Sequence, residues 1–469
     1  MSAVRAIESV RERPPGVPTP VARLEALCDP GTFSPIRTAV TSTRMGAKAE
    51  AGDGVVAGAG RVAGRPVFCY AQDAAFAGGS LGEAHADTIC RTLELAGRSR
   101  SPVVAFIASG GARMQEGLHA MGGYGRIFKA TVQLSGVVPQ ISVVVGTSAG
   151  GGAYSPALTD FVVMTEAATM FLTGPAVVRE VLGEDLSAAE LGGPRVHELN
   201  GVTHLVASDD VEAAALARRL LTFLPAAGEL PPPAPSLAPS LADPGAVVPS
   251  EPRQVYDVRQ ALEGIVDAGS LLELSPRWAK NMVCGLARLE GRAVGVVANQ
   301  PKFLGGVIDA EGSEKAARFV ATCDRFGLPL LVFADTPGFM PGGRQERAGV
   351  IRYGADLLRA FAAAKVPKLT VVLRKAYGGA YITMNSKGLG ADLVFAWPGA
   401  ELGIMGAKQA VGVIHRRESD ERRSVLADAY AEEHLGAEAA ARDGFVDEIV
   451  APAETRSRLA WALDALAGS

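Results

Sequence analysis

Two glycine-rich turns are the parts of this sequence best suited to chemistry. Residues 149–154 (AGGGAY) come shortly after the apolar run QISVVVG, and residues 377–381 (YGGAY) come shortly after the apolar run KLTVVL. A turn between a strand and a helix can point several backbone N–H groups outward at the positive end of a helix dipole. Glycine suits such a turn because a β-carbon would obstruct a ligand and would penalise positive φ. Each turn is therefore a candidate site for an oxyanion or a phosphate, although turn closure would explain one such turn taken alone.

The two turns belong to a longer internal repeat. Four landmarks of the first half recur in the second half with offsets of 227 or 228 residues, and these pairs are Gly78 and Gly305, Ser109 and Thr336, Val138 and Val366, and Gly150 and Gly378. Between the landmarks, short β-branched runs that are typical of buried strands alternate with helical stretches. The repeat predicts an α/β protein that contains two copies of one structural unit.

A proline-rich segment divides the two copies. Residues 226–254 contain eight prolines and almost no large apolar side chain, so we expect neither a helix nor a central strand there. The predicted organisation is an N-terminal domain at residues 1–225, a linker at 226–254 and a C-terminal domain at 255–469. A chain of 469 residues is long enough for two or three domains and a substantial core.

A different reaction would follow if Ser148 were a nucleophile. Gly146 to Gly150 read G-x-S-x-G, as in the nucleophile elbow of hydrolases, and lie between a strand-like run and an expected helix. A serine hydrolase also needs a histidine and an acid. No signature surrounds the downstream candidates His197, His204, His415 and His434. The matching position of the second copy is Ala376, which has no hydroxyl. A hydrolase with Ser148 as nucleophile stays open as the alternative.

Other classes of site lack support in the sequence. There is no G-x-x-x-x-G-K-[ST] phosphate-binding loop. The glycines between residues 54 and 64 alternate with strand-like residues, which favours hairpin turns over a dinucleotide-binding loop. Five widely spaced cysteines favour neither zinc nor a disulfide framework. His85 and His119 each stand alone on an expected helix, so we expect no metal site.

Charge and hydropathy argue against nucleic acid and the membrane as partners of this chain. The formal net charge is −4, with acidic and basic residues interspersed, which argues against nucleic acid as a partner. The first residues contain no signal-peptide core, and no apolar run approaches the ~20 residues of a membrane span. We therefore expect a cytoplasmic protein that does not enter the membrane.

Taken together, seven motifs resemble the carboxyltransferase β subunits of biotin-dependent acyl-CoA carboxylases, of the propionyl-CoA and actinobacterial acetyl/propionyl-CoA type. They are SGGARMQEG, SGVVPQISVVVGTSAGGGAYSPALTDF, LTGP, ELGG, NQPKF, RKAYGGAY and AWPGAELGIMGA, and the resemblance runs from about residue 20 to about residue 465. It implies two tandem crotonase-like domains of the ClpP/crotonase superfamily, each a spiral α/β core, related by internal duplication. It also implies a hexamer whose active sites form between domains of different subunits. Both ends look short for this family, which leaves some terminal contacts open.

The resemblance assigns roles to the two turns. The backbone amides of Gly150 and Gly151 are expected to hold the ureido oxygen of carboxybiotin, and those of Gly379 and Ala380 the thioester oxygen of an acyl-CoA. Such oxyanion holes would allow carboxyl transfer to the α-carbon without a side-chain base. The sequence has no MKM biotinylation site and no ATP-grasp-like region. Biotin is therefore expected on a carrier protein, fused to biotin carboxylase in a separate α subunit. The alternative becomes a CoA-ester hydrolase or a malonyl-CoA-type decarboxylase.

Further residues are expected near the substrates on the same grounds. Arg113 is expected either to meet a CoA phosphate or to be an ordinary exposed helix arginine. Ile382 follows the second hole, where relatives that prefer propionyl-CoA often carry aspartate, so its apolar side chain favours acetyl or longer and mixed acyl chains. The other expected substrate-binding residues are Gly110, Gly111, Gly338, Tyr154 and Tyr381. For the three glycines, closure of a tight turn is an equally good explanation.

Overall fold

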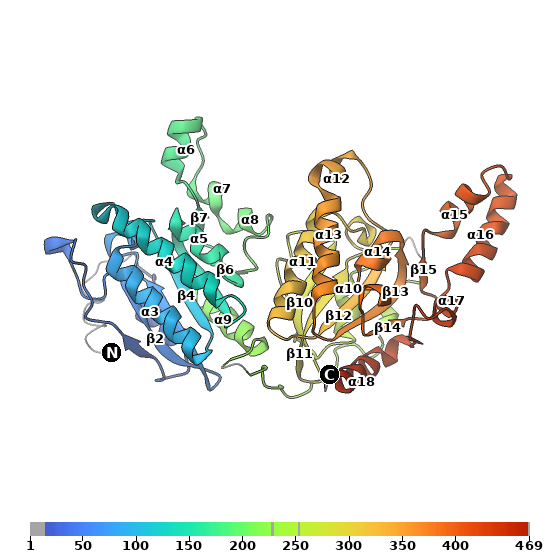
Figure 1. Cartoon of the computed structure of the whole chain (residues 1–469), viewed down its shortest axis with the longest axis horizontal. Helices are drawn as coiled ribbons and strands as arrows, with labels where there is room; N and C mark the ends of the chain where they lie inside the picture. Colours follow the sequence, from blue (N-terminus) through green and yellow to red (C-terminus); the bar gives the residue numbers. More distant parts are fainter. Residues whose placement is uncertain (1–14, 227–228, 252–253, 468–469) are drawn as a thin grey trace. The chain divides into compact units, whose positions relative to one another are not determined.

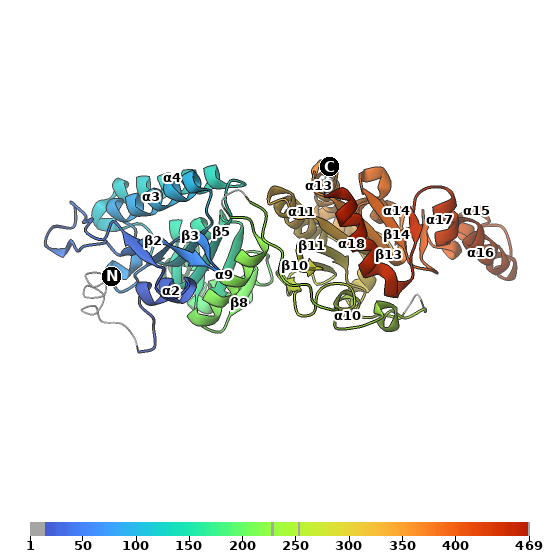
Figure 2. The ribbon, with the colours of Figure 1, turned by 90° about the horizontal axis from the view of Figure 1, so that it is seen from below.

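The chain forms two compact units that divide between Pro231 and Pro232. The structure is a computed structural model that describes residues 15–226, 229–251 and 254–467 (Figure 1). Residues 1–14 and 468–469 of the two expected domains, and four residues of the expected linker, lie outside the described residues. Each unit contains a mixed sheet of eight strands with helices on both faces (Figure 2).

The sheet of the first unit has the strand order β1-β2-β3-β4-β5-β6-β8, and β7 pairs with β5. β1, β2 and β3 pair antiparallel, and the remaining strands pair in parallel. The hairpin of β2 and β3 confirms the hairpin prediction for the glycines between residues 54 and 64. The strands are β1 (Ser34–Ile36), β2 (Val55–Val62), β3 (Arg65–Gln72), β4 (Val103–Ser109), β5 (Gln140–Ala149), β6 (Phe161–Thr165), β7 (Thr169–Phe171) and β8 (Leu205–Ala207).

Helices cover both faces of this sheet. α3 (Glu83–Ser99) and α4 (Leu118–Leu134) pack on one face, and α2 (Pro20–Leu27) and α9 (Asp210–Phe223) pack on the other (Figure 2). α3 buries one apolar stripe at helical spacing, which explains its orientation on the sheet. Four short helices follow β5 and β7, namely α5 (Gly151–Ala157), α6 (Pro175–Leu182), α7 (Ala188–Gly192) and α8 (Pro194–His197).

The sheet of the second unit repeats this order as β9-β10-β11-β12-β13-β14-β16, and β15 pairs with β13. β9, β10 and β11 pair antiparallel and the others in parallel. The strands are β9 (Leu272–Glu273), β10 (Met282–Leu289), β11 (Arg292–Asn299), β12 (Leu330–Thr336), β13 (Lys368–Tyr377), β14 (Leu393–Ala396), β15 (Glu401–Gly403) and β16 (Glu448–Ile449).

The helices of the second unit also lie on two faces. α11 (Ala310–Arg325) and α13 (Val350–Ala363) pack together on one face, and α10 (Val258–Glu263) and α18 (Thr455–Leu466) share the apolar core of the other. The remaining helices are α12 (Gly343–Ala348), α14 (Gly378–Thr383), α15 (Ala407–Ile414), α16 (Asp420–His434) and α17 (Ala437–Arg442). None of the described helices combines the length and the hydropathy needed to cross a membrane.

The strand registers confirm the internal duplication. β4 and β5 pair Val103 with Gln140, and β12 and β13 pair Leu330 with Lys368 at the matching position. Each pair is interrupted by an irregularity just before β4 or β12 ends, between Ile107 and Ser109 or between Ala334 and Thr336. The two copies therefore share topology, register and local distortion, as expected for an α/β unit that has been duplicated.

The proline-rich segment packs along the second unit. The N–H of Ala234 donates to the carbonyl of Gly291 at 2.9 Å, and the N–H of Ser240 donates to that of Glu263 at 2.9 Å. A short 3-10 helix at Pro244–Val247, which the sequence analysis did not expect, begins with a proline whose fixed φ suits the first helical position. Val248 then packs against the core of the unit.

Candidate active site

The first glycine-rich turn joins β5 to α5. Gly150 has φ +56° and ψ −122°, a backbone conformation that only glycine adopts readily. Its N–H donates to the carbonyl of Phe171 in β7 at 3.2 Å, and its carbonyl accepts from the N–H of Ala153 at 3.0 Å. Among the described residues, no acceptor meets the N–H groups of Gly151 and Gly152. The turn therefore presents two adjacent free donors.

Two side chains fix the position of these donors. A β-carbon at Gly151 would lie 2.7 Å from the ring of Tyr124, so the ring packs directly against the backbone. The Tyr124 hydroxyl hydrogen-bonds the Ser109 hydroxyl at 2.9 Å. A β-carbon at Gly152 would lie 3.1 Å from the Ser109 Cβ. Burial raises the pKa of Tyr124 to about 12, so its hydroxyl stays protonated at neutral pH.

The second turn joins β13 to α14 in the same way. Gly378 has φ +58°, close to the value at Gly150. Gly379 is exposed and Ala380 is buried. Neither backbone N–H donates a hydrogen bond to a described residue. α5 has 7 residues and α14 has 6, so few aligned peptide dipoles stand behind either turn. The free N–H groups themselves, more than a helix dipole, are what each turn offers to an anion.

A cavity of about 460 Å³ opens beside the second turn. Its volume lies within the range of small-molecule sites, and most of its lining is apolar. The lining residues are Gly378, Gly379, Tyr381, Ile382, Leu402, Gly403, Ile404, His434, Ala439, Ala440, Asp443 and Phe445. The fold thus brings three of the expected residues, Gly379, Tyr381 and Ile382, to one cavity.

A buried ion pair, which the sequence analysis missed, joins the two strands that carry the second turn and the neighbouring loop. Asp335 near the end of β12 is fully buried and contacts Arg374 Nε at 2.8 Å and Lys375 Nζ at 3.4 Å, both near the end of β13. The Tyr256 hydroxyl donates to the same carboxylate at 2.9 Å. Burial, with the adjacent Asp335 charge, raises the pKa of Tyr256 well above its usual value. In the sequence, the only sign of this ion pair was the adjacent Arg374 and Lys375 directly before the segment AYGGAY.

The expected channel glycines occupy matched loops in the two units. The N–H of Gly111 donates to the Ser109 hydroxyl at 3.3 Å, and the N–H of Gly338 donates to the Thr336 hydroxyl at 3.3 Å. Gly110 is exposed and donates to the carbonyl of Gly78 at 3.0 Å. Turn closure thus accounts for these contacts, and a role in lining substrate channels stays a prediction.

Tyr154 lies on α5, one turn after the first hole. Its side chain is 51% exposed, and its ring meets the Phe128 ring edge-on with centroids 6.2 Å apart. Contact with a substrate at this position also stays a prediction.

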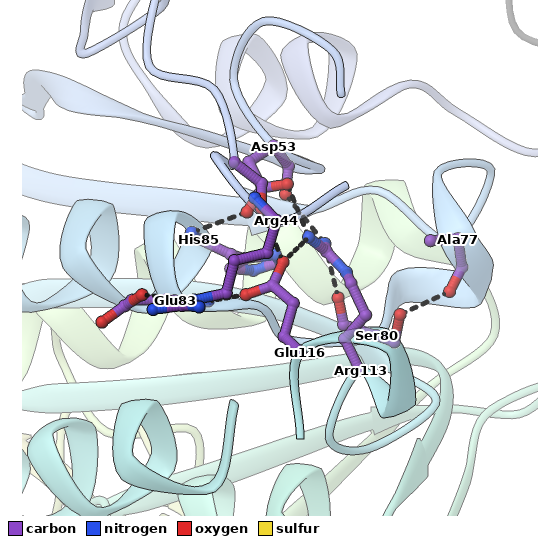
Figure 3. A network of polar contacts seen from close by, with 9 residues as sticks. Arg44, Asp53, Ala77, Ser80, Glu83, His85, Arg113 and Glu116 are labelled. Atoms are coloured by element: carbon purple, nitrogen blue, oxygen red, sulfur yellow. Dashed lines mark hydrogen bonds and ion pairs between the residues drawn. The ribbon is translucent and has the colours of Figure 1, made fainter. Parts of the chain in front are cut away.

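The structure corrects both expectations for Arg113. The side chain is 0% exposed, so it is not an ordinary surface arginine, and its Nη atoms are occupied by groups of the same unit (Figure 3). Nη1 contacts Asp53 at 2.6 Å and Glu116 at 2.8 Å, and Nη2 donates to the Ser80 carbonyl at 2.9 Å. Arg113 is therefore not available to a CoA phosphate in this arrangement.

Ser148 is poorly placed for nucleophilic catalysis. It is 0% exposed near the end of β5, and its hydroxyl has no hydrogen-bond partner among the described residues. The candidate His204 accepts a hydrogen bond from the N–H of Val162 at 3.0 Å, and His197 Nε2 bonds the carbonyl of Met170 at 2.7 Å. No described histidine activates Ser148, which argues against the hydrolase alternative. Within the described ranges, no group of three or more metal-ligating side chains forms a metal site.

Comparison with known proteins fits this geometry. Residues 11–468 match the family described as the carboxyl transferase domain. The chain is 44% identical over 466 residues to the methylmalonyl-CoA carboxyltransferase 12S subunit of Propionibacterium freudenreichii subsp. shermanii, covering 96% of this chain and 88% of that one. It is 44% identical over 460 residues to the mitochondrial propionyl-CoA carboxylase beta chain of Homo sapiens, covering 95% and 84%.

A solved structure gives the same result for the fold. A crystal structure of transcarboxylase 12S, described as a hexamer assembly with methylmalonyl-coenzyme A and methylmalonic acid bound, superposes with a TM-score of 0.93 at 44% identity, covering 100% of this chain and 92% of that one. The two units are thus tandem crotonase-like domains, as the sequence resemblance implied. The chain belongs to the carboxyl transferase domain family and is a carboxyltransferase of the biotin-dependent acyl-CoA carboxylase type.

Proposed function

We propose that this chain transfers a carboxyl group from carboxybiotin on a separate carrier protein to the α-carbon of a short acyl-CoA. One observation carries the proposal: each unit ends its equivalent central strand, β5 or β13, in a glycine turn with two adjacent N–H groups that have no acceptor among the described residues, those of Gly151 and Gly152 or of Gly379 and Ala380. Donors held ready for a developing negative charge are the usual means of stabilising an oxyanion. The proposed products are malonyl-CoA-type acids.

The first turn serves the biotin side of the reaction. Bound carboxybiotin supplies the carboxyl group, and negative charge grows on its ureido oxygen as that group leaves. Of the expected pair, the Gly150 N–H already donates to Phe171, whereas the Gly151 N–H is free. The adjacent free donor is Gly152. The Gly151 N–H therefore stabilises the oxygen, and either Gly150, by releasing Phe171, or Gly152 provides the second hydrogen bond.

The second turn serves the acyl-CoA side. The N–H groups of Gly379 and Ala380 stabilise the thioester oxygen while the α-carbon loses its proton to the ureido nitrogen that has released the carboxyl group. No side-chain base of this chain is therefore needed. Each donor of such a hole contributes about 2.7–4 kcal/mol to transition-state stabilisation. The apolar cavity beside Gly379 supports this assignment because it can shield the acyl group from water.

Ile382 is proposed to influence which acyl chain is preferred. Its side chain is 47% exposed at the edge of the cavity. An apolar side chain at this position favours acetyl or longer acyl chains more than a polar side chain would. The names of the relatives refer to propionyl-CoA and methylmalonyl-CoA, which makes these compounds the first substrates to test. Tyr381 lines the same cavity and is proposed to contact the acyl-CoA.

We further propose a homohexamer that works with a biotin carboxylase and biotin-carrier α subunit. The hexamer assembly described for transcarboxylase 12S and the name beta chain of the human relative support both points. In such an assembly, the Gly151 turn of one subunit would act with the Gly379 turn of another.

The decisive experiment is the reverse reaction with free biotin. The purified chain is given methylmalonyl-CoA or malonyl-CoA, and decarboxylation is measured with and without biotin. We expect decarboxylation only when biotin is present, because the carboxyl group must have an acceptor. Release of free CoA in the absence of biotin would instead identify the hydrolase alternative, and decarboxylation that ignores biotin would identify a simple decarboxylase.

A further inference from the structure

The ion network around Arg113 has no part in the proposed mechanism, yet it holds three segments of the first unit together. Arg113 contacts Asp53 in the turn before β2, Glu116 in its own loop, and the carbonyl of Ser80 in the loop before α3 (Figure 3). Glu116 Oε2 in turn accepts from the N–H of Glu83 at 2.7 Å. The loop that contains Gly110 and Gly111 is thereby tied to two neighbouring segments by groups shielded from water.

A chain of contacts leads from this loop to the first amide turn. The N–H of Gly111 donates to the Ser109 hydroxyl, which also bonds the Tyr124 hydroxyl. A β-carbon at Gly111 would lie 3.3 Å from the carbonyl oxygen of Ala149, the last residue before the turn. Ser109 then packs against Gly152, and the Tyr124 ring packs against the preceding residue. A displacement of the loop would therefore reach the free N–H groups within two contacts.

The second unit contains the corresponding loop without the arginine. The N–H of Met340 donates to the carbonyl of Ile308 at 2.8 Å, and the N–H of Arg113 donates in the same way to the carbonyl of Leu81 at 2.9 Å. Met340 thus occupies the position of Arg113. Asn281 lies one residue after the position that matches Asp53, and Gln345 lies two residues after the position that matches Glu116. Asn281 also donates to the Asp309 carboxylate at 3.0 Å.

Two side-chain amides of the second unit, those of Asn281 and Gln345, contact the backbone groups that match the partners of Arg113 and Glu116. The Asn281 side chain donates to the carbonyl of Val307 at 2.9 Å, whereas in the first unit Arg113 donates to the matching carbonyl of Ser80 at 2.9 Å. Gln345 Oε1 accepts from the N–H of Ala310 at 3.0 Å, as Glu116 accepts from Glu83. Side-chain amides at neighbouring positions therefore hold the second loop where Arg113 and Glu116 hold the first.

We propose that Arg113 is a positioning residue for the Gly150–Gly152 turn, and that it acts through the geometry of its loop and not through its charge at the substrate. Removing the guanidinium alone leaves two carboxylates buried without a cation, which forces the loop to move or to admit water. Exchanging all three side chains for neutral ones, as in Asp53→Asn, Arg113→Met and Glu116→Gln, removes the charges together and keeps side-chain oxygens that can accept from the N–H groups of His85 and Glu83. The two changes should therefore have opposite outcomes.

The test compares Arg113→Met with the triple variant Asp53→Asn, Arg113→Met, Glu116→Gln in the full chain. Arg126→Met is the matched control, because it removes an arginine of α4 whose ion pair with Asp87 is exposed. Hydrogen exchange is followed by mass spectrometry in the peptides that cover residues 109–113 and 147–153, which include the hydrogen-bonded amides of Gly150 and Ala153. We expect faster exchange in both peptides of Arg113→Met only.

Kinetics gives a second readout, and this part alone rests on the proposed function. In biotin-dependent decarboxylation of methylmalonyl-CoA, Arg113→Met should lower kcat by about 100-fold, as expected for ~1 Å misplacement of catalytic groups, while KM changes little. The triple variant should recover most of kcat. If the wild type shows no biotin-dependent activity, the proposed function fails while the exchange result still judges the positioning role.

Two results would overturn the inference. Unchanged exchange at residues 147–153 in Arg113→Met would show that the network ends at its own loop. A folded triple variant as impaired as Arg113→Met would show that charge matters and geometry does not. If Arg113→Met does not fold, the triple variant decides alone: a protected turn with retained kcat supports the inference, and an exposed turn refutes it.

Discussion

The close packing of Tyr124 on the first turn makes a sharp comparison between the two units possible. Gly151 and Gly379 occupy the same position in the duplicated fold. A β-carbon at Gly151 would lie 2.7 Å from the Tyr124 ring, whereas one at Gly379 would lie 3.7 Å from Phe339, which is ordinary contact. Neither glycine has positive φ, so an alanine at either position differs only in the space that it finds.

The magnitudes follow from the packing. Tyr124 is 4% exposed and its hydroxyl is bonded to Ser109, so the ring cannot move away without cost. Overpacking of this kind destabilises by about 1–3 kcal/mol. A shift of the N–H groups by ~1 Å costs about 100-fold in rate. We therefore expect Gly151→Ala to lower both the urea midpoint and kcat. Gly379→Ala should change the free energy of unfolding by no more than the ~0.5 kcal/mol typical of surface changes, so its urea midpoint should stay close to that of the wild type.

Urea unfolding followed by circular dichroism and the biotin-dependent decarboxylation assay measure the two effects. The pair of variants is its own control, because the same methyl group is added to the same backbone position of each unit. Equal urea midpoints for Gly151→Ala and Gly379→Ala, with unchanged kcat for the former, would refute the claim that Tyr124 fixes the first turn.

Three further predictions concern single side chains. Ile382→Asp should lower kcat/KM for butyryl-CoA relative to acetyl-CoA, because a carboxylate at the cavity edge disfavours a longer apolar chain; unchanged ratios among acetyl-, propionyl- and butyryl-CoA would remove this residue from specificity. Ser148→Ala should leave biotin-dependent decarboxylation intact, since the hydroxyl is buried and without a partner; loss of activity in a folded variant would revive the nucleophile hypothesis. Burial, aided by the charge of Arg113, lowers the pKa of His85 from 6.5 to about 3. Below pH 6.5 His85 therefore binds a proton in the unfolded chain but not in the folded chain. The free energy of unfolding decreases as the pH is lowered, by up to about 1.4 kcal/mol per pH unit. His85→Gln should flatten the dependence of the urea midpoint between pH 6.5 and 5, and a parallel slope in both proteins would contradict the assignment.

Much of the fold was accessible from the sequence because duplication leaves a local record. Constant offsets between glycines, prolines and β-branched runs predicted two copies of an α/β unit, and the matched registers confirm it. The turns were found for the same reason: Gly150 and Gly378 need positive φ, and that need shows in the residue type itself. The cavity-lining Tyr381 and Ile382 were found because they directly follow such a turn.

The buried ion networks could not be found in this way. Asp53 and Arg113 are 60 residues apart, and Asp335 and Arg374 are 39 residues apart. For Arg113 the sequence analysis left a contact with a CoA phosphate and an exposed helix position open, and the structure places the side chain in the interior. Local patterns report backbone conformation, whereas the burial of a charge depends on which distant carboxylate the chain brings beside it.

The sequence by itself determined the α/β class, the duplication and the two glycine turns, because these follow from backbone preferences of short segments. Only the tertiary structure decided which amides are free, since β7 takes the N–H of Gly150 and leaves those of Gly151 and Gly152. It alone also decided that Arg113 is buried and that the Ser148 hydroxyl has no partner among the described residues. Hydrogen-bond partners are selected by packing between segments far apart in the chain, and no spacing within one segment specifies them.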